Sequence, residues 1–118
     1  MHTISKEFHF SAGHHLLCLA SDHPCTKPHG HNYVVRVFFR GPVNHQGFVV
    51  DYNDLKPIGV WLDHHLDHTD LNDFFGDMST TVENMTEYLF KMFKPSYPTL
   101  FAIEMSETPK TTCRYEPR

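Results

Sequence analysis

Four stretches of the chain alternate apolar and polar residues with the period of a half-buried β-strand. They cover roughly residues 2–11, 33–40, 99–107 and 112–116. The second stretch is the clearest, because every other residue in it is apolar: Tyr33, Val35, Val37 and Phe39. In the third stretch the same count places Phe101, Ile103 and Met105 on one face. We therefore expect four strands, two near each end of the chain.

Two helices are predicted between the second and third strands. Asp51 and Asn53 are suitable N-caps for the first, with Pro57 near its first turn. Its apolar face carries Leu55, Ile58, Leu62 and Leu66. Thr80 and Glu83 have the spacing of a capping box at the start of the second helix. The apolar face of that helix carries Val82, Met85, Leu89, Met92 and Phe93.

The predicted order ββααββ indicates an α+β fold, in which a four-stranded antiparallel sheet carries both helices on one face. A chain of 118 residues suffices for one domain, so we expect residues 1–118 to form a single domain. The two edges of such a sheet are unpaired, and we expect copies of the chain to associate there. Residues 12–28 lack periodicity and contain Gly13, Pro24 and Pro28. They are predicted to form a long loop, and such loops usually carry function.

Composition narrows the possible classes of function. The net charge of -4 offers phosphate backbones no basic face, so we expect no nucleic-acid partner. No apolar run approaches the roughly 18 residues of a membrane span, and the N-terminus lacks an apolar signal core, so we expect neither membrane association nor export. Three cysteines are too few for a secreted disulfide framework, which favours the cytoplasm. Eleven histidines, six of them within residues 9–31, point to a metal ion.

The segment His29-Gly30-His31 enters the clearest strand, where residues i and i+2 point to the same side. His14, at the exit of the first strand, can supply a third imidazole from a neighbouring strand. Three nitrogen ligands form the open set that catalytic zinc uses, with one position left for water or substrate. The alternative is that His29 and His31 merely form a polar strand edge.

Cys25 lies four residues before His29, where a nearby cation would favour its thiolate. It can act in catalysis, bind zinc as a fourth ligand, or be an inert packed thiol. The interval between Cys18 and Cys25 is too wide for a zinc finger, and we interpret Cys18 and Cys113 as structural.

Two carboxylate features are candidates for proton transfer or ligand binding. Asp67 beside His68 can orient the imidazole for proton transfer, although Asp63 with His64 repeats the pattern and either pair could be solvated surface. Counting by twos along the third strand places Glu107 on the apolar face, where a carboxylate needs a partner. A heterocycle that offers two adjacent N–H groups would satisfy it; if the strand ends earlier, Glu107 lies in solvent.

These residues fall into four motifs that together resemble the 6-pyruvoyltetrahydropterin synthase family. In chain order the motifs are Phe10-Ser11-Ala12-Gly13-His14, Cys25-x3-His29-Gly30-His31-Asn32-Tyr33, Leu66-Asp67-His68-Thr69-Asp70-Leu71-Asn72 and Ser106-Glu107-Thr108. The chain looks most similar to the bacterial 6-carboxytetrahydropterin synthase branch, because three residues separate Cys25 from His29 and animal pyruvoyl-forming enzymes typically have five. His15 departs from the arginine that many relatives carry.

The resemblance implies the tunnelling fold, with trimeric barrels stacked into a homohexamer, and a role for each motif residue. His14, His29 and His31 would bind Zn²⁺, Cys25, Asp67 and His68 would be catalytic, and Glu107 with Thr108 would bind the pterin. In the family the site forms between subunits, and a neighbour supplies the Asp-His pair. Asp63 with His64 remains the alternative pair.

The implied reaction converts 7,8-dihydroneopterin triphosphate into 6-carboxy-5,6,7,8-tetrahydropterin, releases acetaldehyde and triphosphate, and serves queuosine and related 7-deazapurine biosynthesis. One alternative keeps the fold and the zinc but stops at 6-pyruvoyltetrahydropterin, without loss of acetaldehyde. A more distant alternative is a non-enzymatic, histidine-rich metal-binding protein.

Overall fold

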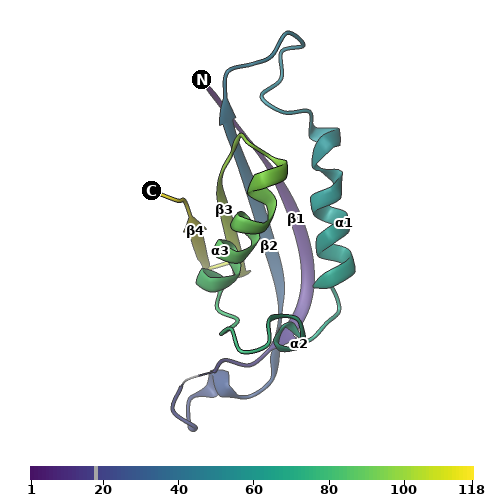
Figure 1. The fold of residues 1–118 in the computed structure, drawn as a ribbon. Coiled ribbons are helices and arrows are strands. Elements are labelled where there is room, and N and C mark those ends of the chain that lie inside the picture. The colour runs from purple at the N-terminus through teal and green to yellow at the C-terminus, as the bar shows by residue number, and fades with distance from the viewer. Residues whose placement is uncertain (18) are drawn as a thin grey trace.

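The computed structural model describes residues 1–17 and 19–118, so Cys18 lies outside the described residues. Its four strands form one antiparallel sheet in the order β1-β2-β3-β4 (Figure 1). The strands are β1 (His2–His14), β2 (His29–Gly41), β3 (Leu100–Thr108) and β4 (Thr111–Tyr115). The predicted α+β fold with a four-stranded antiparallel sheet is confirmed.

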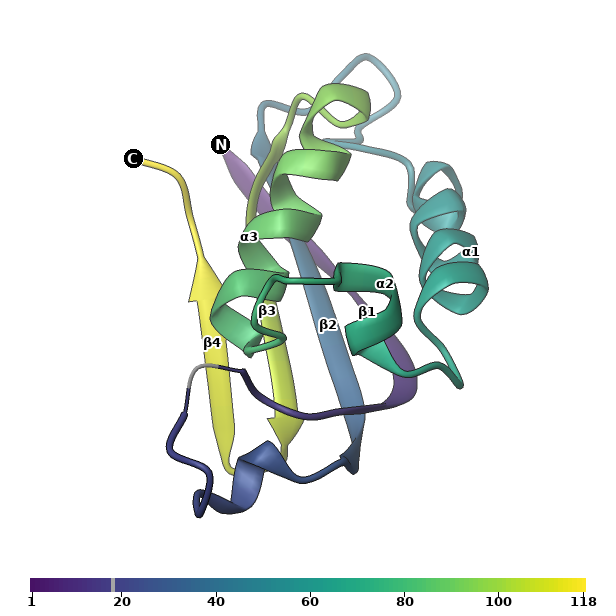
Figure 2. The same cartoon turned by 60° about the horizontal axis from the view of Figure 1, so that its bottom comes forward.

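The helices lie together on one face of the sheet (Figure 2). They are α1 (Lys56–His65), α2 (Leu71–Phe75) and α3 (Val82–Phe93). The short helix α2 was not predicted. Helices α1 and α2 both contact β1, whereas α3 packs on β3 and β4. Three short 3-10 helices are Pro24–Thr26, Tyr52–Leu55 and Lys94–Ser96. Within the described part of the chain, the helices are too short or too polar to cross a membrane.

The core lies between the sheet and the helices. The predicted apolar face of β2 is fully buried there: Tyr33, Val35, Val37 and Phe39. It packs against the predicted apolar faces of both helices, including Ile58 and Leu62 of α1 and Met85 and Leu89 of α3. The alternation of β2 therefore also fixes the side to which its first residues point, and those residues include two of the candidate histidines.

Both strands of the first hairpin are longer than predicted. The ladder pairs His2 with Gly41 at one end and His14 with His29 at the other, so the connecting loop begins at residue 15 rather than 12. Gly13 and Gly30 are paired within this extension. The alternation is hidden there because histidines occupy the inward positions that apolar residues fill elsewhere.

Three local predictions were wrong. The side chain of Asp51 caps the 3-10 helix Tyr52–Leu55 and not α1, whose N-cap Leu55 makes no capping hydrogen bond through its side chain.

The other two concern α3 and β3. Thr81, and not Thr80, caps α3, because the Thr81 hydroxyl accepts from the Asn84 N–H at 3.2 Å while Thr80 is fully buried. Phe101 does not share a face with Ile103, because the β2–β3 register shifts next to it. Its ring instead packs on Phe38, with the Arg40 guanidinium 4.3 Å from its centroid.

Candidate metal centre and active site

Three imidazoles converge where β1 ends and β2 begins. His14 and His29 are paired residues in the antiparallel ladder, and His31 points to the same side as His29 because two residues separate them. One potential ligand atom from each ring lies within 4.8 Å of the other two. His14 is 3% exposed, and His29 and His31 are half-buried. The site is therefore built on two rigid strands, with one ligand in the core and two at its rim.

Hydrogen bonds fix the tautomers of two of these rings. The Nδ1 atom of His14 lies 3.0 Å from the carbonyl oxygen of Thr80, and Nδ1 of His29 lies 2.8 Å from that of Lys27. A carbonyl oxygen can only accept, so each Nδ1 carries the proton and each Nε2 presents a lone pair. The two Nε2 atoms are 3.1 Å apart.

This donor set fits a zinc ion. Tetrahedral coordination with Zn–N bonds of about 2.0–2.1 Å places ligand nitrogens roughly 3.3–3.4 Å apart, close to the observed separation of His14 and His29. Backbone carbonyls that accept from the distal ring nitrogens are the usual orienting partners of metal-binding histidines. Three protein ligands also leave a coordination position for water or substrate.

The surroundings keep the buried groups of this centre neutral. Burial lowers the pKa of His14, and the neighbouring His29 and His31 lower it further, whereas the Thr80 carbonyl and Glu107 oppose the shift. His14 is thus favoured in the neutral form that can bind a metal ion. Beneath it, burial and the charge of Glu107 raise the pKa of Tyr33, whose hydroxyl lies 3.4 Å from His14 Nδ1.

Glu107 faces the histidines from β3. Its Oε2 lies 3.6 Å from Nε2 of His31, and its side chain is 31% exposed. Counting every second residue along β3 predicts that Glu107 points to the apolar side of the sheet. The strand continues to Thr108, so it does not end before Glu107. Glu107 therefore places an accepting carboxylate beside the metal centre, reachable from solvent. The Thr108 hydroxyl lies 3.2 Å from that of Thr111, in the turn between β3 and β4.

Asp67 and His68 are bound to the free edge of β1. The Ser11 N–H donates to Asp67 Oδ1 at 2.8 Å, and the His68 N–H donates back to the Ser11 carbonyl at 2.6 Å. His68 Nδ1 in turn lies 2.8 Å from Asp67 Oδ2. These hydrogen bonds hold the pKa of Asp67 below its usual range. The bond from Ser11 contributes most, followed by the bond from His68. The carboxylate is thus anchored by the sheet and orients the imidazole.

The His68 side chain is 84% exposed. Its backbone has φ 59°, a left-handed conformation that non-glycine residues seldom adopt and that occurs more often at functional sites. His68 and His31 line one shallow hollow of about 390 Å³. The alternative candidate His64 lies instead on α1, where its ring packs against that of His65.

Cys25 lies in the 3-10 helix Pro24–Thr26 and is half-buried. Its N–H donates to Nδ1 of His23 at 3.1 Å, and its carbonyl accepts from the Leu16 N–H at 2.7 Å. Among residues 1–17 and 19–118, the group of potential metal ligands comprises only the three histidines. The geometry therefore offers no support for Cys25 as a fourth ligand and leaves its thiol outside the cluster.

Two residues of the site, Asn72 and Thr80, were not predicted from the sequence to have a role in it. Asn72 binds the His15 backbone through both ends of its amide, accepting from the N–H at 2.9 Å and donating to the carbonyl at 3.0 Å. The position of Asn72 at the end of the third family motif was the one feature of the sequence that could have indicated this role. Thr80 orients His14, but a threonine just before a helix looks like a cap, so its sequence context gave no such signal.

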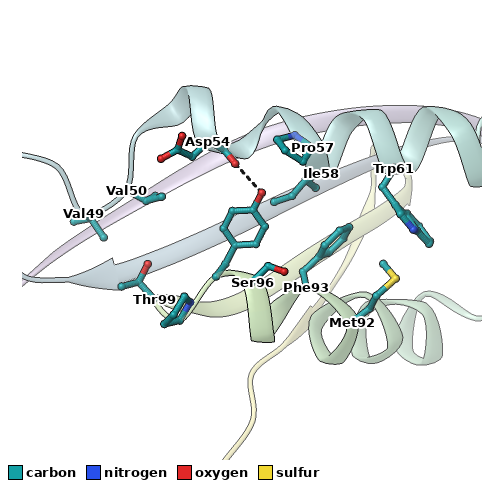
Figure 3. Close-up of a pocket in the computed structure, with 12 residues that line it drawn as sticks. Val49, Val50, Asp54, Pro57, Ile58, Trp61, Met92, Phe93, Ser96 and Thr99 are labelled. Atoms are coloured by element: carbon teal, nitrogen blue, oxygen red, sulfur yellow. Dashed lines mark hydrogen bonds between the residues drawn. The ribbon is translucent and has the colours of Figure 1, made fainter.

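A larger cavity lies apart from these residues, between α1 and α3 (Figure 3). It has a volume of about 790 Å³ and an aromatic lining that includes Trp61, Phe93 and Tyr97. The Tyr97 hydroxyl donates to the Asp54 carbonyl at 2.7 Å across its rim. None of the predicted site residues lines this cavity, so its size does not mark it as the active site.

The fold and the site together define the class: an α+β protein with three histidines that could hold a metal ion at one end of an antiparallel sheet and an Asp-His pair on the sheet edge. Residues 3–118 match the model of the family described as 6-pyruvoyl tetrahydropterin synthase. The chain belongs to this family, as the four motifs predict.

Relatives with both product names are similar to the chain. A 6-carboxy-5,6,7,8-tetrahydropterin synthase of Synechocystis is 33% identical over 98% of this chain and 93% of the relative. A synthase of the same name from Bacillus subtilis is 29% identical over 98% of this chain and 85% of its own. The structure of 6-pyruvoyl tetrahydropterin synthase from Caenorhabditis elegans superimposes with a TM-score of 0.88 at 30% identity, covering 98% of this chain and 95% of the other.

Proposed function

We propose that this chain is a zinc-dependent 6-carboxy-5,6,7,8-tetrahydropterin synthase. It would convert 7,8-dihydroneopterin triphosphate and one water molecule into 6-carboxytetrahydropterin, acetaldehyde and triphosphate, as a lyase of queuosine or related 7-deazapurine biosynthesis in the cytoplasm. The observation that carries the proposal is the convergence of His14, His29 and His31 beside Glu107, in a chain of this family. The three-residue interval between Cys25 and His29 favours the carboxy-forming reaction.

His14, His29 and His31 would hold the zinc ion, with Nε2 of His14 and His29 as ligands. When bound, the ion supplies a Lewis acid that lowers the pKa of coordinated hydroxyl groups on the substrate side chain. Tyr33 and Thr80 are buried on the core side of the histidines, so a substrate would reach them from the solvent side, where Glu107 lies.

Glu107 would bind the pterin ring. An ionised carboxylate only accepts hydrogen bonds, and the 2-amino group and adjacent ring N–H of a pterin form a matching pair of donors. This charge-assisted contact would orient the ring so that its side chain reaches the histidines. Thr108, the next residue on β3, is the second proposed pterin contact.

Cys25 and His68 would move the protons. As a thiolate, Cys25 would remove the proton from the side-chain carbon next to the ring. His68 would exchange protons with the side-chain hydroxyls while Asp67 holds its Nδ1, leaving Nε2 as the working atom. Triphosphate elimination and cleavage of the carbon–carbon bond that releases acetaldehyde would follow these proton transfers.

We further propose that residues 1–118 form one domain and that the site is completed in a homohexamer. Both free sheet edges would pair with neighbouring copies, β1 with the short strand β4. The exposed His68 lies on the β1 edge and would then enter a neighbour's site. An isolated subunit is accordingly expected to be inactive.

One experiment tests this function against its alternatives. Zinc-loaded protein is incubated anaerobically with 7,8-dihydroneopterin triphosphate, and the products are identified by mass spectrometry alongside an acetaldehyde assay. Carboxytetrahydropterin with acetaldehyde would support the proposal. Pyruvoyltetrahydropterin without acetaldehyde would favour the second candidate, which is supported by the similarity to the Caenorhabditis elegans structure. Absence of turnover by a zinc-bound hexamer would contradict both.

A further inference from the structure

We infer that Thr80 is a positioning residue for the metal ligand His14. The inference rests on the proposed zinc centre and deepens it, because it assigns a role to a residue that touches neither the metal ion nor the substrate. Thr80 lies immediately before Thr81, the cap of α3, and is fully buried.

Thr80 offers His14 two acceptors at once. Its carbonyl oxygen and its hydroxyl oxygen each lie 3.0 Å from Nδ1 of His14. The hydroxyl also lies 3.5 Å from the His15 carbonyl, which can only accept, so the hydroxyl donates there and accepts from His14. The Thr80 hydroxyl proton is therefore directed at the His15 carbonyl, and the His14 Nδ1 proton at Thr80.

This arrangement decides which nitrogen of His14 faces the other histidines. A half-turn of the ring would aim a carbon atom at the two acceptors and leave them unsatisfied in a buried place, which is costly. The hydrogen bonds therefore keep Nδ1 on Thr80 and leave the Nε2 lone pair facing His29. Preorganising a ligand in this way is how outer partners raise metal affinity.

The contact also ties the metal centre to the helical layer. His29 takes its acceptor from Lys27, two residues away, whereas 66 residues separate His14 from Thr80. The orientation of His14 therefore depends on where the segment immediately before α3 meets the end of β1. Thr80 makes this connection, because its two oxygen atoms bind the imidazole ring of His14 directly.

Zinc affinity tests the inference without reference to turnover. Competition with a chromophoric chelator is measured for wild type, Thr80→Val, Thr80→Ser and the control Thr86→Val. Thr86 is also fully buried, but its hydroxyl donates to the Val82 carbonyl within α3, so the control makes the same change away from the histidines. Thr80→Val removes the hydroxyl acceptor and keeps the backbone carbonyl, so we expect a loss at the lower end of what outer partners contribute, about tenfold in affinity. Thr80→Ser, which keeps the hydroxyl, and Thr86→Val should retain wild-type affinity.

An affinity of Thr80→Val equal to that of Thr86→Val would overturn the inference. If Thr80→Val does not fold, the ¹⁵N spectrum of wild-type, metal-free protein decides instead. His14 must then carry its proton on Nδ1, and a proton on Nε2 would refute the assignment.

Failure of this inference is distinguishable from failure of the proposed function. Weakened zinc binding by Thr80→Val in a protein that does not turn over the pterin substrate would leave the inference intact and reject the function. Normal zinc binding by the variant beside an active wild type would reject only the inference. A wild type that binds no zinc would reject both.

Discussion

The Nε2 atoms of His14 and His29 face each other at 3.1 Å, while the Nδ1 atom of each ring donates to a backbone carbonyl. With both protons held on the far side, two lone pairs converge, and their repulsion is relieved only by a cation or an additional proton between the rings. A protein that fixes two imidazoles in this way is preorganised for a metal ion.

Removing one of these ligands should remove the metal. We expect wild-type protein to carry one zinc ion per chain and His29→Ala to carry far less, as measured by elemental mass spectrometry after dialysis. His45→Ala is the control, because His45 is an exposed histidine in the segment between β2 and α1. Full zinc content in His29→Ala, or several ions per wild-type chain, would point instead to a non-enzymatic metal-binding protein.

Cys25→Ser should separate catalysis from metal binding. The thiol lies outside the histidine cluster, so zinc content should stay at the wild-type value. Loss of the thiolate base should lower kcat by about 10²- to 10⁴-fold. Cys113→Ser is the matched control, since Cys113 lies on β4, where its Sγ is 3.7 Å from the Thr86 hydroxyl. Near-wild-type turnover by Cys25→Ser would exclude its proposed role.

The sequence was sufficient to predict the sheet and the two longer helices. Strand and helix periodicities are strong where one face is fully buried, as in β2 and α3. The prediction failed where functional residues or strand pairing interrupt the alternation of apolar and polar residues. The ends of β1 and β2 present histidines where core residues would otherwise alternate, and the register shift beside Phe101 depends on pairing with β2.

The three histidines could be recognised from the sequence, but the residues that orient them and the neighbouring backbone could not. His29 and His31 share a strand face by spacing alone, whereas Thr80 and Asn72 act through backbone contacts 57 to 66 residues away. A threonine before a helix is usually a cap, and here the next threonine takes that role. Only the contact of Thr80, in the segment before α3, with His14 at the end of β1 shows what Thr80 does.

The two candidate Asp-His pairs can be tested against each other. We expect His68→Asn to lower kcat by about 10²- to 10⁴-fold, because it removes the proton-transferring imidazole. Asparagine tolerates the left-handed backbone at this position, so the fold should be retained. His64→Asn, made on the exposed surface of α1, should leave kcat unchanged. The reverse result would transfer the catalytic role to Asp63 and His64.

Asp67 should contribute a stability that is lost in acid. Its folded-state pKa is lowered, so its contribution is fully present above the unfolded value of about 3.9 and disappears as the pH falls through the folded value. Urea unfolding should therefore show Asp67→Asn less stable than wild type at pH 7, with the difference shrinking below about pH 4. A difference for Asp67→Asn that stays constant with pH would mean that the carboxylate charge is not the cause.

Glu107→Gln should weaken substrate binding more than it slows chemistry. Glutamine keeps the size of the side chain but replaces one accepting oxygen by a donating amide, which meets one of the two pterin donors head-on. The expected result is a raised KM with a smaller change in kcat, since a group that orients the ring binds ground state and transition state alike.

Glu104→Gln provides the comparison for this change. Glu104 lies three residues earlier on β3, outside the histidine site, where its Oε2 accepts from Arg114 at 2.9 Å. The same substitution there should leave both kinetic constants unchanged. Steady-state kinetics of the two variants, at wild-type zinc content, therefore measure the effect of the carboxylate at the site alone. An unchanged KM for Glu107→Gln would count against its role as the pterin-binding residue, and a loss confined to kcat would point instead to its contact with His31, at 3.6 Å.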